Sequence, residues 1–352
     1  MVRSTATVGQ LSEPLLRYLQ RRSGGIARPL LDTLSGGGMD REPPPAVGVS
    51  GLNSNGMPLQ LCVSARCERT VMVLVADPCA HLENPRARQR ESVACAWRLL
   101  EQTGSEGLAS ALRSTLTAML PAAPGEQDTR RMGVLWLGAG VQKPAFTLYT
   151  CPAWDGDVAT GWNRVERWLR RVLQDPQPAL RMMKHIRDVA SPDCACIEGA
   201  GSGSARAKVY FRLLRAVDPN ALGCLRLNTP EIGTFIEEAV GSYRPRISAM
   251  VFGVSFRLET GEFSDSKVDL CGHCVQRPVD QWQSVLRRVG ERLQINTTEA
   301  IAMLQEDGIE LACIGIGRDY SGALRINTYG RPVRAMADTS NRIRQTSQVT
   351  AS

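Results

Sequence analysis

The chain has 352 residues, of which 42 are basic and 35 acidic, so its formal net charge is +7. This mild excess fits a protein with an anionic ligand. The absence of a Lys/Arg-rich run and an aromatic content of 5% argue against a nucleic-acid partner. No apolar run approaches the ~18 residues of a membrane span, and the N-terminus lacks a charged-then-apolar signal pattern. We therefore expect neither a membrane nor a nucleic acid as partner.

Eleven cysteines are scattered along the chain, several of them inside apolar strand patterns (Cys62, Cys151, Cys313). Such positions suit reduced thiols better than a disulfide framework, so we expect a cytoplasmic protein. Cys271-Gly-His-Cys274 has dithiol spacing, and Cys194-Ala-Cys196 could join it in a metal site. Because there is no second CxxC and no His pair at zinc spacing, we predict that the chain has no metal site.

The first 45 residues are predicted to form a helix and a linker. Apolar residues from Leu11 to Leu19 recur at helical spacing, and Ser35 to Pro45 contains three glycines and three prolines. A unit of strand, strand and helix follows, at Leu59–Ser64, Thr70–Ala76 and about Arg86–Gln102.

Four further units repeat this order. Each has a central residue on its second strand, and these recur about every 60 residues: Thr147, Lys208, Lys267 and Arg325. The second strands are expected at Ala145–Tyr149, Arg206–Tyr210, Asp265–Asp269 and Ala323–Asn327, and the strands before them at Val134–Val141, about Cys194–Glu198, Ile247–Leu258 and Glu310–Gly317. Helical stripes run through Val158–Val172, Ile232–Tyr243 and Val279–Leu293, with an extra helix near Leu108–Leu120.

Each second strand has two different faces, because alternate side chains point to opposite sides. One face is apolar and holds Phe146, Leu148, Val209, Phe211, Val268, Leu270, Leu324 and Ile326; the other holds Lys208, Tyr210, Lys267, Asp269, Arg325 and Asn327. Small-residue pairs on the preceding strands, Gly138/Gly140, Gly253/Ser255 and Gly315/Gly317, leave open space on one face.

Five such units predict an α+β fold in which about ten antiparallel strands close into a barrel, with the helices outside. Closure removes the exposed edges that an open sheet would present. The apolar strand face would pack under the helices and the polar face would point inward. We expect this barrel to be a single domain at residues 46–333, preceded by the helix and linker at 1–45 and followed by a flexible tail at 334–352.

An inward row of cations implies a multivalent anionic ligand, since burying several positive charges together is costly without compensation. Diphosphate is the obvious candidate. Tyr149, Tyr210 and Tyr329 can donate hydrogen bonds to phosphate oxygens, and their rings can face a carbocation. This combination suits ionisation of an allylic diphosphate. The alternative is that the cations lie at the barrel mouth and face solvent, with tyrosines at ordinary strand propensity.

The chain resembles the soluble aromatic prenyltransferases built on the αββα barrel, including dimethylallyltryptophan synthase-like enzymes and cyanobactin peptide prenyltransferases. The resemblance spans roughly Pro58 to Pro332. It rests on Arg206-Ala-Lys208-Val-Tyr210, on Glu259-Thr-Gly-Glu262 followed by Lys267-Val-Asp269-Leu-Cys271, and on Ile314-Gly-Ile-Gly317 with Leu324-Arg325-Ile326-Asn327.

The resemblance implies transfer of a prenyl group from an allylic diphosphate to an aromatic acceptor, either a small indole or phenol or a peptide that contains one. Basic residues would stabilise the departing diphosphate, tyrosines would shield the cation, and a carboxylate would orient or deprotonate the acceptor. Residues expected to bind the diphosphate are Arg206, Lys208, Tyr210, Lys267, Arg325, Asn327, Tyr149 and Tyr329. No cofactor is expected to be required, although Mg²⁺ dependence varies within the family, and we expect a monomer.

Two positions of the first unit depart from the family pattern. The family often has a glutamate on the first strand and an arginine on the second, where this chain has Gln60 and the Val71–Leu74 run. Thr147 likewise replaces a lysine in the second unit. We therefore expect Asp269 first, and Glu198 second, to replace the missing base, with Gln60 accepting a hydrogen bond from the acceptor. Asp265 is another candidate carboxylate, and the candidate replacement cations are Arg66, Arg69 and Lys143.

Two other functions stay open on this sequence. A terpene cyclase could use the same barrel to fold a bound isoprenoid on itself. A barrel that has lost its chemistry through the substitutions in the first unit could instead bind an isoprenoid diphosphate or a peptide without turnover.

Overall fold

The computed structural model describes residues 6–44, 50–122, 133, 135–200, 205–215, 223–242, 249–275 and 277–334. Its ten strands form one closed antiparallel barrel, with β1 paired to both β10 and β2. The strands are β1 (Leu59–Ala65), β2 (Thr70–Ala76), β3 (Leu135–Gly140), β4 (Phe146–Thr150), β5 (Ala190–Gly199), β6 (Arg206–Leu213), β7 (Met250–Arg257), β8 (Phe263–Cys271), β9 (Ile309–Asp319) and β10 (Leu324–Pro332). The predicted closed barrel is confirmed.

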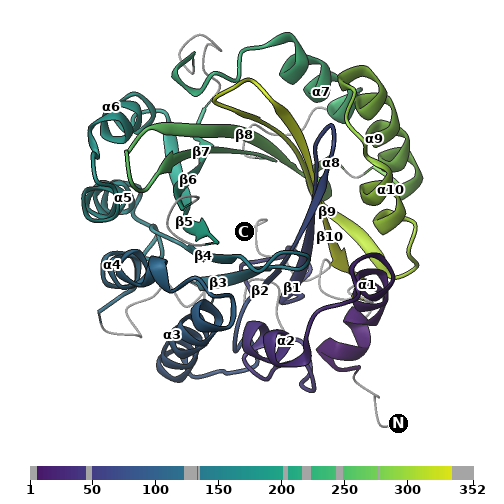
Figure 1. The fold of residues 1–352 in the computed structure, drawn as a ribbon, viewed down its shortest axis with the longest axis horizontal. Helices are drawn as coiled ribbons and strands as arrows, with labels where there is room; N and C mark the ends of the chain where they lie inside the picture. Colours follow the sequence, from purple (N-terminus) through teal and green to yellow (C-terminus); the bar gives the residue numbers. More distant parts are fainter. Residues whose placement is uncertain are drawn as a thin grey trace, which may run out of the picture.

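Helices surround this ring of strands (Figure 1). They are α1 (Val8–Ser23), α2 (Arg28–Ser35), α3 (Pro85–Gln102), α4 (Ala109–Met119), α5 (Val158–Val172), α6 (Gln177–Ile186), α7 (Pro230–Val240), α8 (Gly272–Val275), α9 (Val279–Leu293) and α10 (Thr298–Leu304), with a 3₁₀ turn at Glu106–Leu108. The core lies between the helices and the outer face of the barrel, where Phe146, Leu148, Val209, Phe211, Val268, Leu270 and Ile326 are buried. The apolar face of the second strands therefore points outward.

Helices α1, α3, α5 and α7 begin at residues whose side chains cap them. Asp157 accepts a hydrogen bond from the Ala159 amide at 2.9 Å and starts α5. Thr229 caps α7, with Pro230 in its first turn. The buried face of α5 includes Trp162 and Trp168, and each indole N–H has a partner: the Ala190 carbonyl and the Thr115 hydroxyl, both at 2.9 Å. Both tryptophans therefore belong to the scaffold, and Trp162 lies on the helical stripe predicted through Val158–Val172.

The last unit differs from the predicted repeat, because no helix follows β10 within the described residues. Helix α1, from the other end of the chain, packs against β10 instead. The Tyr18 hydroxyl of α1 donates a hydrogen bond of 2.8 Å to the Glu299 carbonyl of α10. Helix α1 thus covers the last strand, β10, which pairs with the first strand, β1, to close the barrel.

The predicted linker from Ser35 to Pro45 is more ordered than its composition indicates. Ser35 ends α2, which the sequence analysis did not predict, and Met39 is buried against the core. Gly36 and Gly37 adopt positive φ angles, which lets the chain turn directly after the helix. Residues 45–49 and 335–352 lie outside the described residues, and the second range holds all of the predicted tail except Arg334. Val134, Tyr243 and the first residues of the strand predicted at 247–258 also lie outside them.

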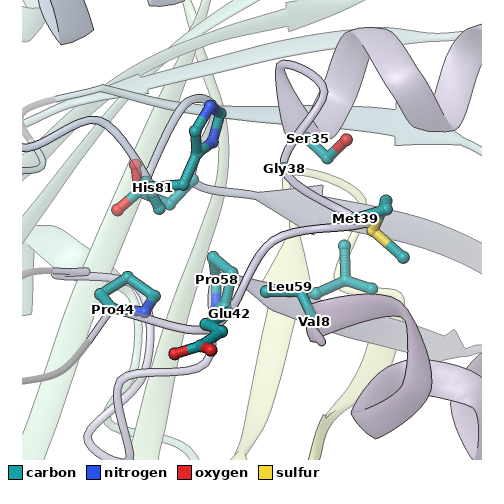
Figure 2. A pocket seen from close by; sticks show the side chains of 11 residues that line it. Val8, Ser35, Gly38, Met39, Glu42, Pro44, Pro58, Leu59 and His81 are labelled. Atoms are coloured by element: carbon teal, nitrogen blue, oxygen red, sulfur yellow. The ribbon is translucent and has the colours of Figure 1, made fainter. Parts of the chain in front are cut away.

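A small cavity of about 10 Å³ lies outside the barrel, between α1, the segment after α2 and the start of β1 (Figure 2). Val8, Met39 and Leu59 line it, and His81 reaches it from the loop after β2. Its volume fits about one water molecule, so it is no substrate site. In the described part of the chain, no helix has both the length and the apolar character that crossing a bilayer requires.

Candidate functional site

The polar side chains of the second strands line the inner face of the barrel. Lys267 lies opposite Gly253 on β7 and Gly317 on β9, and Arg325 also pairs in register with Gly317. Their sequence neighbours Val268 and Ile326 belong to the outer core. Since strand side chains alternate, Lys267 and Arg325 point inward.

Glycines on the neighbouring strands make room for these side chains. A Cβ atom at Gly253 would lie 2.9 Å from ring atoms of Tyr210 and 3.2 Å from Lys267 Cγ, and one at Gly317 would lie 2.7 Å from Arg325 Cζ. At Gly315 it would meet Asp269 Oδ1. The space that these small residues leave on the strands is thus filled by charged and aromatic side chains, which lie flat against the barrel wall.

Five charged residues form one chain of ion pairs at the end of the barrel where the β5–β6, β7–β8 and β9–β10 connections lie. We call this chain the hairpin-end network. Glu198 accepts from Lys208, with Nζ 2.5 Å from Oε2, and also pairs with Arg206. Arg206 pairs in turn with Asp265, whose other oxygen lies 3.0 Å from Arg325 Nη2. The members in order are Lys208, Glu198, Arg206, Asp265 and Arg325. Three predicted diphosphate ligands therefore lie together, and each already has a carboxylate partner.

Lys267 lies apart from this network, in the middle of the inner wall. Its Nζ is 2.5 Å from Asp269 Oδ2 and donates a hydrogen bond of 2.8 Å to the Tyr329 hydroxyl. It also lies 4.8 Å from the centre of the Tyr210 ring and 5.3 Å from that of Tyr329, distances typical of cation–π contacts. The Tyr149 and Tyr210 ring centres are 6.3 Å apart. Two of the three predicted tyrosines, Tyr210 and Tyr329, thus contact one buried cation, and Tyr149 lies beside Tyr210.

Burial governs the ionisation of these tyrosines. It is the largest cause of the raised pKa values of Tyr149, Tyr210 and Tyr329, and nearby thiols and carboxylates raise them further. All three hydroxyls therefore stay protonated at neutral pH and can donate hydrogen bonds to an anion.

The two carboxylates of the hairpin-end network are held ionised. Burial alone would raise the pKa of Glu198, but the charges of Arg206 and Lys208 outweigh it and lower the pKa to about 2. Asp265 behaves in the same way: Arg325 and Arg206 overcome the effect of burial and lower its pKa. A general base works best with a pKa near the working pH, so Glu198 is poorly suited to accept a proton.

Asp269, the first candidate for the missing base, has one oxygen in use and one without a partner. Oδ2 pairs with Lys267, whereas Oδ1 is buried and has no hydrogen-bond partner among the described residues. The residue as a whole is only 6% exposed. A buried carboxylate oxygen without a donor is costly, so Oδ1 is a position where a ligand N–H or O–H would be stabilised.

The departures in the first unit do lie on the inner face. Gln60 and Cys62 alternate with Leu59, Leu61 and Val63, which belong to the outer core. Val75 and Val73 of β2 are the register partners of Gln60 and Cys62, so their side chains also face inward. This wall has no cation. Thr147 pairs in register with Glu198 and is buried, and Asn327 lies opposite Gly315.

Two of the proposed replacement cations lie near the hairpin-end network. The pKa of Arg66 is lowered by its burial and then by the positive charges of Arg325, Arg69 and Arg206. Arg66 and Arg69 belong to the turn between β1 and β2, which is at the same end of the barrel. Lys143 lies in the turn between β3 and β4.

A thiol cluster that we did not predict from the sequence lies at the opposite end of the barrel interior. Cys271 and Cys313 are register partners, and the Arg212 guanidinium lies 3.7 Å from Cys271 Sγ. A hydrogen bond from Cys313, together with Arg212, lowers the pKa of Cys271 to about 6 even though burial opposes this. Arg212 stands two residues after Tyr210, so strand alternation was the available signal. Among the described residues, no group of three His, Cys, Asp or Glu side chains could hold a metal ion.

Comparison with known proteins finds relatives in structure but not in sequence. No family model matches the chain, and no curated protein matches it. Among solved structures, 5-dimethylallyltryptophan synthase from Streptomyces coelicolor is 17% identical, with a TM-score of 0.73 over 93% of this chain and 97% of that one. The 6-dimethylallyltryptophan synthase from Micromonospora olivasterospora, in complex with DMASPP and Trp, is 15% identical, with a TM-score of 0.76 over 92% and 96%.

A further match is prenyltransferase PriB in its ternary complex with L-tryptophan and dimethylallyl thiolodiphosphate. It is 15% identical, with a TM-score of 0.75 over 94% of this chain and 99% of that one. Identities this low establish the fold alone. The chain therefore has the αββα-barrel fold of these prenyltransferases, with ten strands closed inside a layer of helices.

Proposed function

We propose that the chain is an aromatic prenyltransferase that transfers an isoprenoid group from an allylic diphosphate to an indole or phenol, free or within a peptide. The observation that carries this proposal is Lys267 surrounded by Tyr210 and Tyr329 on the inner wall of a closed barrel, beside three more cations. An allylic diphosphate separates into an anion and a carbocation, and this wall offers both basic groups and π faces.

The residues divide into three roles. Arg206, Lys208, Lys267 and Arg325 would bind the diphosphate, with Asn327 as a further donor. The rings of Tyr149, Tyr210 and Tyr329 would shield the cation, and their protonated hydroxyls can donate to phosphate oxygens. Such preorganised charges act most strongly where water is excluded.

Asp269 would accept the acceptor's proton, or orient it, through Oδ1. That oxygen is buried and has no partner, and the Lys267 ammonium on Oδ2 keeps Asp269 beside the diphosphate. Gln60 can accept a hydrogen bond from the acceptor but cannot take its proton.

The first experiment incubates the protein with dimethylallyl, geranyl or farnesyl diphosphate, with and without tryptophan or a tryptophan-containing peptide. Diphosphate release and product mass are measured, each with Mg²⁺ and with EDTA. A prenylated acceptor supports the proposal. A cyclised isoprenoid formed without acceptor identifies a terpene cyclase. Binding of the prenyl diphosphate without any turnover contradicts the proposal that the chain is an enzyme.

The Asp269→Asn variant tests the proton-accepting role. It should lower formation of the coupled product at least tenfold while binding of the prenyl diphosphate stays near that of the wild type. If Asp269 is only the counterion of Lys267, diphosphate binding should change first. Coupling at the wild-type rate would show that Asp269 is not the base.

One observation favours a binding protein as the second candidate. Every interior cation expected to bind diphosphate already has a carboxylate partner, and the β1–β2 wall has valines where the family often has an arginine. A barrel that binds an isoprenoid diphosphate without reacting would need no acceptor, so the turnover assay separates the two candidates.

A further inference from the structure

The hairpin-end network has a charge arrangement that a diphosphate would also satisfy. Glu198 uses its two oxygens to bridge Lys208 and Arg206, and Asp265 uses its two oxygens to bridge Arg206 and Arg325. The two carboxylates thus place acceptor oxygens among three cations, as two linked phosphoryl groups would. The side chains of Lys208, Asp265 and Arg325 are 13%, 4% and 9% exposed, so water does little to stabilise their charges.

The same contacts create a competition. An Arg or Lys side chain that donates to a carboxylate must share or release that contact before it can donate to a phosphate oxygen. Both carboxylates stay ionised at neutral pH, because the neighbouring cations outweigh burial and lower their pKa values. Both carboxylates therefore keep their negative charges, and continue to compete for the cations, when a diphosphate binds.

We infer that Glu198 and Asp265 are internal counter-anions, which position Lys208, Arg206 and Arg325 in the ligand-free chain and yield them to the diphosphate of the substrate. They are positioning residues and set the affinity of the site. This inference rests on the proposed function, since it takes diphosphate as the ligand of the network.

Arg66 and Arg69 together supply the charge that the exchange needs. Three cations and two carboxylates leave the hairpin-end network with one positive charge, whereas a prenyl diphosphate has about three negative charges. Arg66 follows Ala65, which pairs in register with Ile326, the residue after Arg325. Burial lowers the pKa of Arg66, and the positive charges of Arg325, Arg69 and Arg206 lower it further. Arg66 and Arg69 can therefore pair with the displaced carboxylates or with the outer phosphate.

The test measures binding of inorganic diphosphate by calorimetry to the wild type, Glu198→Gln and Asp265→Asn. Each substitution keeps the shape of the side chain and an acceptor oxygen but removes the competing charge. We expect each to tighten diphosphate binding about tenfold, the effect of one charge-assisted contact. Glu310→Gln is the matched control: its carboxylate pairs with Arg331 at the other end of β9, so it removes one negative charge away from the network.

Thermal unfolding gives a second readout that a purely structural role would not produce. Without ligand, Glu198→Gln and Asp265→Asn should unfold at lower temperature than the wild type, because buried cations lose their partners. Saturating diphosphate should then raise their unfolding temperature by more than it raises that of the wild type. Because unfolding is followed with and without ligand, this comparison can still be made on a weakly folded variant.

The results distinguish failure of this inference from failure of the proposed function. If the wild type binds diphosphate but both variants bind it equally or more weakly, Glu198 and Asp265 are structural and the inference is wrong. If the wild type does not bind diphosphate, the inference and the proposed function both fail.

Discussion

Replacing Lys267 tests the centre of the proposed site, and the structure separates its effect on stability from its effect on ligand binding. Lys267 contacts Asp269, the Tyr329 hydroxyl and two tyrosine rings, and both members of the ion pair have side chains only 9% exposed. Lys267→Met leaves the Asp269 carboxylate buried without its cation. Breaking such a pair costs about 3–5 kcal/mol.

If Lys267 binds the diphosphate as we propose, the same substitution also removes a charge-assisted contact worth about 1.5–3 kcal/mol or roughly ten- to a hundredfold in binding. We therefore expect Lys267→Met to be less stable in urea unfolding and to bind inorganic diphosphate at least tenfold more weakly. Its turnover should fall by at least an order of magnitude, and that of Lys208→Ala likewise.

The double variant Lys267→Met/Asp269→Asn removes both charges of the pair. Stability should recover most of its loss, because no charge is left unpaired, whereas diphosphate binding should stay weak. Recovery of diphosphate binding together with stability would show that Lys267 serves only to neutralise Asp269. Unchanged turnover in Lys267→Met and Lys208→Ala would refute a catalytic role for the inner cations.

Three further predictions follow from the geometry. Gly317→Ala should weaken diphosphate binding measured by calorimetry, because the new Cβ would lie 2.7 Å from Arg325 Cζ; wild-type affinity would mean that Arg325 can move without loss. The pKa of Glu198 falls from 4.5 to about 2 on folding, so its ion pairs stabilise the fold above about pH 4.5 and are lost as the pH falls toward 2. Acid unfolding of Glu198→Gln should therefore depend less on pH over that range. Cys271→Ser/Cys274→Ser should keep wild-type turnover and metal content by elemental analysis, and loss of stoichiometric zinc would overturn our interpretation of the CxxC.

Strand alternation was sufficient to predict which residues face the barrel interior. The repeat of Lys208, Lys267 and Arg325 depends only on local sequence, and a period of two assigns each of them to a face. We predicted barrel closure because an open sheet of five similar units would leave two unprotected edge strands. We did not predict helix α2 because Arg28–Ser35 is short and is followed by a run of glycines. Such a run is a loop signal, and it was stronger than the helical spacing of so few residues.

The partners of these residues could not be predicted in the same way. Arg206 and Asp265 lie 59 positions apart in the chain, and their contact depends on register across β6, β7 and β8. From the sequence we therefore expected the inner cations to need a ligand, whereas each of them already pairs with a carboxylate of the barrel and one net positive charge remains. The Cys271–Cys313 contact likewise depends on the register of β8 against β9, while the CxxC spacing pointed to Cys274.

Glycines and cations on the inner wall are two parts of one structural requirement. Lys267 and Arg325 can lie flat against the wall only because Gly253 and Gly317 occupy the facing positions of the neighbouring strands. A larger residue there would push each cation away from its carboxylate, and a buried charge without a partner would destabilise the barrel. On β2 the inward positions are valines, and β1 beside it has Gln60 and Cys62, so this wall has no charge to accommodate. Charge in the barrel interior is therefore concentrated on β5, β6, β8 and β10, whereas the inward face of β2 is apolar.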